Sequence, residues 1–286
     1  MRDVLMALLV GLSVVPATAA PRIITLAPHL AELVCAAGAC AQLVGVADFT
    51  DEPRTATLPR IGNAHAVNTE RVLALRPDWV LFWDGGMSPD IARRLISMGL
   101  RVDRLAVRGL DDIPVAIERI GRQAGTTGVA QAAARAYRQR LAALRRQYAD
   151  RPLLRVFYQI ETAPAYTINR HSPIHEALAL CGGRNLFADL PVIAGAVNDE
   201  AVIAARPEVV VTTDFEDVAA LDVYWARFPN LPAAQHRVVV SANAITRQSP
   251  RVLDGVEQLC RGLDRVRLTH DARSPQRRAS VPAGAP

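Results

Sequence analysis

The chain has 286 residues, of which half are hydrophobic and about a fifth are charged, so it has the composition of a globular protein with room for two domains, and intrinsic disorder is excluded. All basic residues are arginine, and the formal net charge of +5 is not gathered into a stripe; three positive charges sit at Arg273, Arg277 and Arg278 in the C-terminal tail. Nucleic-acid binding, which needs clustered basic residues on one element, is therefore excluded.

Residues 1–19 have the pattern of an export signal. Arg2 precedes an apolar run over residues 4–15, which is too short to span a bilayer, and Ala17-Thr18-Ala19 is a small-x-small cleavage site. A core or amphipathic helix is the alternative. We expect cleavage after Ala19 and a mature protein in the periplasm, an oxidising compartment. No cysteine follows the run and no later stretch reaches the length of a membrane span, so no membrane anchor is expected.

The first part of the mature chain alternates short apolar strands with helices. The strands are expected at 22–28, 43–47, 79–83 and 102–105, and the helices at 29–37, 69–75 and 91–98. This alternation is typical of βαβ units and a mainly parallel sheet. Residues 128–148 lack proline, and glycine after position 128, and they predict one helix of about 30 Å that ends before Pro152.

A second α/β series follows the long helix. Strands are expected at 155–160, 209–212 and 238–241, and helices at 174–181, 199–205 and 250–263. The fold class is α/β, with two Rossmann-like lobes bridged by one helix. We expect an N-terminal lobe over 20–125, the bridging helix over 126–150, a C-terminal lobe over 151–267 and a disordered tail over 268–286.

An internal repeat supports the two lobes. Residues 67–78 recur at 197–208 without a gap, and seven of these twelve positions are identical. The offset of 130 residues is too long for a solenoid, so it indicates two copies of one fold. Two such lobes leave a cleft, and ligands of α/β sheets lie beyond the carboxyl ends of the strands. That rule selects candidate ligand-binding residues from the loops: Phe49, His65, Trp83, Asp84, Tyr166, Asn243 and Arg247.

Four cysteines, Cys35, Cys40, Cys181 and Cys260, remain in the mature chain. An even number in an exported protein favours disulfides, and three pairings are possible. Gly38 would let Cys35 and Cys40 pair locally. A zinc site is the alternative, but the Cys-x4-Cys spacing has no second close pair.

Seven ordered segments carry a resemblance to a known family. They are Pro21–Pro28, Val44–Val46, Asn68–Asp78, Trp83–Gly86, Arg155–Phe157, Cys181–Phe187 and Ser249–Cys260. With these segments the chain resembles the helical-backbone class of periplasmic binding proteins, which bind iron-siderophore, cobalamin or haem, and within it most closely the cobalamin binders. The resemblance implies a receptor of an ABC importer, a Cys181–Cys260 disulfide, and docking of Glu70 and Glu200 onto the permease dimer that works with ATPase subunits. Helix capping is the alternative role for both glutamates.

The ligand implied is cobalamin or a related cobalt- or iron-containing chelate, bound by a monomer that needs no cofactor and performs no catalysis. Ala64 and Ala194 stand where cobalamin binders place tryptophan, so haem and ferric siderophores stay open as ligands. A periplasmic enzyme acting on a tetrapyrrole is the alternative from another class. His29 or His65 could bind the metal of a chelate, and His171 with His175 could form a metal pair if that stretch were helical.

Overall fold

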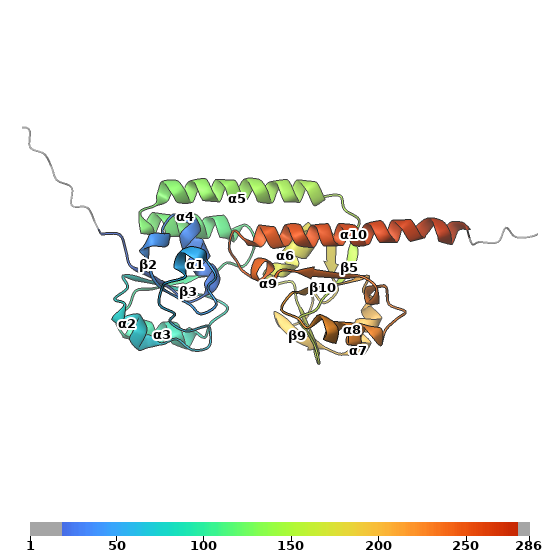
Figure 1. Ribbon diagram of the computed structural model, residues 1–286, viewed down its shortest axis with the longest axis horizontal. Coiled ribbons are helices and arrows are strands. Elements are labelled where there is room, and N and C mark those ends of the chain that lie inside the picture. Colours follow the sequence, from blue (N-terminus) through green and yellow to red (C-terminus); the bar gives the residue numbers. More distant parts are fainter. Residues whose placement is uncertain (1–18, 280–286) are drawn as a thin grey trace, which may run out of the picture.

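Two α/β lobes make up the protein, and each is built on a four-stranded parallel sheet (Figure 1). The structure is a computed structural model that describes residues 19–279, and the expected signal peptide lies outside these residues except for Ala19. The sheet orders are β2-β1-β3-β4 and β11-β10-β5-β8. The strands are β1 (Ile23–Thr25), β2 (Leu43–Val46), β3 (Trp79–Trp83), β4 (Val102–Leu105), β5 (Leu154–Tyr158), β8 (Gly183–Asn185), β10 (Val209–Thr213) and β11 (Arg237–Val240). The predicted fold class is confirmed.

Helices cover both faces of each sheet. On the face away from the long helices lie α2 (Thr69–Ala74), α3 (Pro89–Ser97), α7 (Asp199–Ala205) and α8 (Val218–Ala226) (Figure 1). The other face carries α1 (Pro28–Ala36), α4 (Asp112–Ala124), α5 (Thr127–Tyr148), α6 (Pro173–Leu180), α9 (Ala242–Ile245) and α10 (Val252–Ala279). On this second face one hydrophobic cluster runs from Ile23 to Val266 and joins the interiors of both lobes. Burial of this continuous apolar surface stabilises the two lobes together.

The sequence analysis missed several elements. Helices α4 and α8 were not predicted, and neither were the two strands that lie within residues 161–171. These are β6 (Glu161–Thr162) and β7 (Ala165–Ile168), which form an antiparallel sheet with β9 (Ala194–Val197). Short 3-10 turns also occur at Cys40–Gln42, Pro53–Thr55 and Pro232–Ala234.

The internal repeat folds into the same unit twice. Asn68 caps α2 by accepting a hydrogen bond from the amide of Arg71 at 2.9 Å, and Asn198 caps α7 in the same way at the amide of Ala201. After each helix comes an arginine whose backbone is in the left-handed region, with φ of 45° at Arg76 and 46° at Arg206. The shared sequence therefore encodes a helix with the same start and the same stop before β3 and β10.

The long helix α5 links the lobes, as predicted, and packs on the outside against α4 of one lobe and α10 of the other (Figure 1). Arg140 of α5 pairs with Asp254 of α10 at 2.7 Å, and Arg145 of α5 contacts both Asp111 and Glu176. The expected disordered tail from residue 268 is instead helical as far as Ala279, because Gly262, within α10 next to the predicted end, packs closely against Val238 and does not end the helix; residues 280–286 lie outside the described part of the chain.

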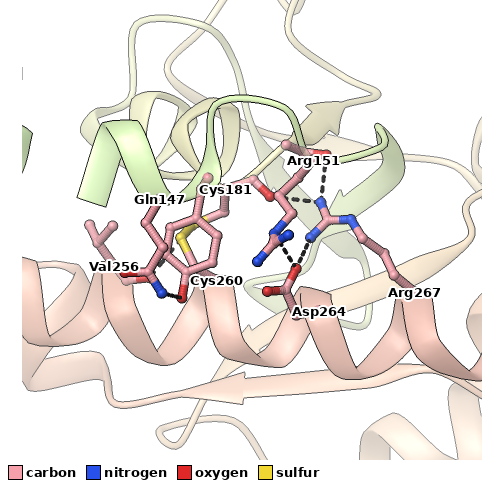
Figure 2. The surroundings of a disulfide bond; sticks show 9 residues. Gln147, Arg151, Cys181, Val256, Cys260, Asp264 and Arg267 are labelled. Atoms are coloured by element: carbon pink, nitrogen blue, oxygen red, sulfur yellow. Dashed lines mark hydrogen bonds and ion pairs between the residues drawn. A yellow bond between two sulfur atoms is a disulfide. The ribbon is translucent and has the colours of Figure 1, made fainter. Parts of the chain in front are cut away.

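Two disulfides are present, Cys35–Cys40 and Cys181–Cys260. Figure 2 shows the second one, which joins Cys181 at the end of α6 to Cys260 in the first third of α10. Arg267 of α10 reinforces this junction by donating to the carbonyl oxygens of Pro152 and Cys181 at 2.8 and 2.7 Å. The Cys181–Cys260 bridge that the resemblance implies is confirmed, and the possible Cys35–Cys40 bridge is also present, so these thiols are not available as zinc ligands. Among residues 19–279, no helix is both long and apolar enough to cross a bilayer.

Candidate functional site

A cavity of about 390 Å³ lies between the lobes and is lined from both of them. The N-terminal lobe contributes Trp83 and Asp84 at the end of β3 and Arg108 after β4, while the C-terminal lobe contributes His171 before α6 and Gln248 after α9. Val107, Pro173 and Ile193 add apolar walls. A cleft at the carboxyl ends of parallel strands is the usual ligand site of such sheets.

A second cavity of about 250 Å³ belongs to the N-terminal lobe. Phe49, Ala64, His65 and Trp83 line it, so the indole of Trp83 is a wall shared by both cavities. Phe49 has a left-handed backbone, with φ of 60°, and its side chain is 79% exposed. An exposed aromatic ring beside a cavity offers an apolar surface to a ligand.

The ring of Trp83 is held from two sides. His29, at the start of α1, meets it edge-on with 5.0 Å between ring centroids. On the other side, a methyl group at Gly86 would overlap the indole, so only glycine fits there. His29 is 4% exposed, and its Nε2 has no hydrogen-bond partner among the described residues. Burial, and then the positive charge of Arg247, lower the pKa of His29 to about 3, so the imidazole is neutral.

A cluster of charges joins the lobes next to His29. The guanidinium of Arg247 donates to Glu32 Oε1 at 2.7 Å, to Asn243 Oδ1 at 2.7 Å and to Asp51, and its side chain is only 11% exposed. Arg251 also donates to Asp51, at 2.8 Å. Burial acts to raise the pKa of Asp51, but the two arginines hold it below its usual range. We call Glu32, Asp51, Arg247 and Arg251 the interlobe ion cluster.

The structure brings only part of the predicted ligand set together. Phe49, His65, Trp83 and Asp84 line the two cavities, and Asp84 is ion-paired with Arg104. Three further candidates line neither cavity. Tyr166 is half-buried on β7. Arg247 belongs to the interlobe ion cluster, and Asn243 accepts a hydrogen bond from it.

Several cavity residues were missed by the sequence analysis. Val107 and Arg108 follow the strand at 102–105, so the strand-end rule could have found them. Ile193 and Gln248 carry no such signal, because Ile193 precedes a strand that was not predicted and Gln248 follows a one-turn helix.

The two histidines considered as a metal pair are separated. His171 lies before α6, which begins at Pro173, and its ring lines the interlobe cavity. His175 lies inside the helix, where its Nδ1 is 3.5 Å from the side-chain amide of Asn185, and burial lowers its pKa. The helical stretch that a pair would need is absent at His171.

The two repeated glutamates take matching positions. Glu70 lies in the first turn of α2 and Glu200 in the first turn of α7, and both are exposed. In Figure 1 these helices lie on the side of the lobes away from α5. Asparagine side chains already cap both helices, so the glutamates are not needed as caps and are open to a partner.

Comparison with known proteins gives consistent matches. The model of a family described as periplasmic binding protein matches residues 23–245. A vitamin B12-binding protein of Vibrio cholerae is 36% identical over 244 residues, which are 84% of this chain and 88% of that protein. The crystal structure of the periplasmic vitamin B12 binding protein BtuF of Vibrio cholerae has a TM-score of 0.80 at 34% identity, covering 87% of this chain and 98% of that one. A periplasmic heme binding protein from Pseudomonas aeruginosa has a TM-score of 0.73 at 26% identity, covering 84% and 91%.

Proposed function

Because the chain belongs to the periplasmic binding protein family, we propose that it is the receptor of an ABC importer that binds cobalamin, or a related corrinoid, in the interlobe cleft. The cavity lined by both lobes carries this proposal, since it contains an aromatic wall at Trp83 and lies at the strand ends. The family resemblance inferred from the sequence is confirmed by the same matches.

The chemistry of the cleft suits a large, flat chelate. Trp83 and Phe49 offer ring faces, and Val107 and Ile193 offer aliphatic surface, so the planar part of a ligand can be bound by dispersion and apolar burial. Polar groups at the edge fix its orientation.

Haem is the second candidate ligand. The heme binding protein from Pseudomonas aeruginosa has the same fold at 26% identity, and the small side chain of Ala64 leaves room in the second cavity, beside Trp83. A titration that follows the ligand's visible absorption distinguishes the candidates. The mature protein should bind one cobalamin per chain and release it unchanged; binding of haem alone would favour the second candidate, and conversion of either ligand would indicate an enzyme.

Trp83 provides the test of where the ligand binds. Changing Trp83 to alanine removes the wall shared by both cavities and should weaken binding by about 2 kcal/mol or more, roughly 30-fold. Phe215, which is exposed and lines neither cavity, is the matched control. If Trp83→Ala bound the chelate as tightly as Phe215→Ala, the cleft would not be the ligand site.

We propose that delivery uses Glu70 and Glu200 as docking points for basic residues of the permease dimer, in the periplasm. Their equivalent places in the two repeats suit a partner with twofold symmetry. Charged rim contacts set orientation and encounter rate more than affinity. The double change of both glutamates to arginine should therefore leave ligand binding intact and abolish uptake in cells. Weak ligand binding with normal uptake would mean that they belong to the pocket instead.

A further inference from the structure

The charges around the interlobe cavity do not cancel. Its charged lining residues are Asp84 and Arg108. Asp84 is already neutralised by Arg104, whose Nε donates to Asp84 Oδ1 at 3.0 Å. The neighbouring Arg247 is likewise neutralised, by the carboxylates of the interlobe ion cluster. Within the described part of the chain, the side chain of Arg108 has no hydrogen-bond or ion-pair partner, so the cavity carries one uncompensated positive charge.

A second hydrogen-bonding side chain faces the same cavity from the other lobe. The ring of His171 lines it, and within residues 19–279 neither ring nitrogen has a partner. Both residues have a fixed backbone: Asp112 accepts from the amide of Arg108 at 2.8 Å, and Asn169 accepts from the amide of His171 at 2.8 Å. The two side chains therefore start from anchored positions on opposite sides of the cleft.

Gln248 also lines the cavity, but its polar atoms are already taken up or enclosed. Its amide nitrogen donates to the carbonyl oxygen of Thr246 at 3.1 Å, and its Oε1 is buried. The cavity thus presents hydrogen-bond donors for an anion beside an apolar wall.

We propose that Arg108 and His171 bind an anionic group of the chelate, a phosphodiester or carboxylate, from the two lobes at once. This inference rests on the proposed function and specifies the ligand: a metal chelate with an anionic side arm binds more tightly than its neutral counterpart. Arginine suits the role because its planar N–H groups match two oxygens of one anion. Arg108 is then a specificity residue, since the apolar wall is available to charged and uncharged chelates alike.

Paired probes test the proposal. Cobalamin carries a phosphodiester that cobinamide lacks, and haem carries two carboxylates that its dimethyl ester lacks. Each probe is titrated against the wild type, Arg108→Gln, His171→Gln and the control Arg94→Gln, whose exposed arginine lies on α3 outside both cavities. We expect Arg108→Gln to weaken cobalamin binding about 10- to 100-fold and to leave cobinamide binding unchanged. His171→Gln should act in the same direction, and Arg94→Gln should change neither.

The outcomes separate this proposal from the proposed function. Equal losses for cobalamin and cobinamide, or none for either, would overturn the anion site while the corrinoid receptor stands. If the wild type binds neither corrinoid, the corrinoid function fails, and the haem pair decides: a preference for haem over its ester that Arg108→Gln removes supports the anion site, and no preference overturns it. Binding of none of the four probes overturns both.

Discussion

Acid should destabilise this protein through His29. The imidazole is 4% exposed and neutral in the folded protein, where its pKa falls from 6.5 to about 3 because of burial and then the charge of Arg247. In the unfolded chain the same group is protonated below about pH 6.5. Between these two values the unfolded state binds one more proton, so the free energy of unfolding falls by up to about 1.4 kcal/mol per pH unit as the pH is lowered. At about pH 4.5, two units below 6.5, the loss is roughly 2.7 kcal/mol.

Urea denaturation at about pH 7 and about pH 4.5 measures this loss. His29→Phe keeps an aromatic ring against Trp83 but cannot take up a proton. The loss of stability in this variant comes from the other titrating groups, so the additional loss in the wild type measures the contribution of His29. The exposed His65, changed to glutamine, is the control and should lose as much as the wild type. If wild type and His29→Phe lost the same stability, the buried neutral imidazole would be refuted.

Three other perturbations follow from the same structure. Changing Arg247 to methionine leaves the carboxylate of Glu32, 6% exposed, without its main partner, and should lower the free energy of unfolding in urea by about 3 kcal/mol; a loss below about 1 kcal/mol would contradict the buried pair. Replacing Cys181 and Cys260 together by serine opens a loop of 79 residues and should cost roughly 4–5 kcal/mol by thermal or urea unfolding, whereas unchanged stability would argue against the bridge. Gly86→Ala should displace the tryptophan ring of the cleft and weaken chelate binding in a titration, while an alanine at position 128, where a methyl group meets nothing within 4 Å, should not; equal affinities would show that the ring tolerates the methyl group.

The fold was predictable where its signals are local. The Asn cap, the apolar positions and the Arg-Pro stop of the repeat lie within twelve residues, and both copies fold as expected. Helix α4 was not predicted because its sequence contains Pro114 and Gly121, two residue types that usually interrupt helices. Pro114 is tolerated in the first turn, and Gly121 is needed where α4 packs closely against Ala130 of α5. The pairing of β7 with β9 joins residues about 30 positions apart and leaves no local pattern.

The candidate site shows the same limit. The strand-end rule depends on chain order alone, and of the residues that it selected Trp83 and Asp84 line the interlobe cavity. Arg247 looked like a ligand residue because the sequence gives no sign that Glu32, 215 residues earlier, is buried beside it. Conversely, nothing in the sequence distinguishes Arg108 from other loop arginines, because its importance comes from the lack of a hydrogen-bond or ion-pair partner for its side chain among the described residues.

The continuous hydrophobic cluster beneath α5 and α10 has a consequence for affinity. A receptor whose halves are joined by a flexible hinge must lose conformational entropy when it closes, and this loss is subtracted from every contact with the ligand. Here the two halves share one interior and are further joined by the contacts of Glu32 and Arg145, so their relative orientation is fixed before the ligand arrives. The cleft is therefore preorganised, and most of the interaction free energy made inside it is retained as affinity.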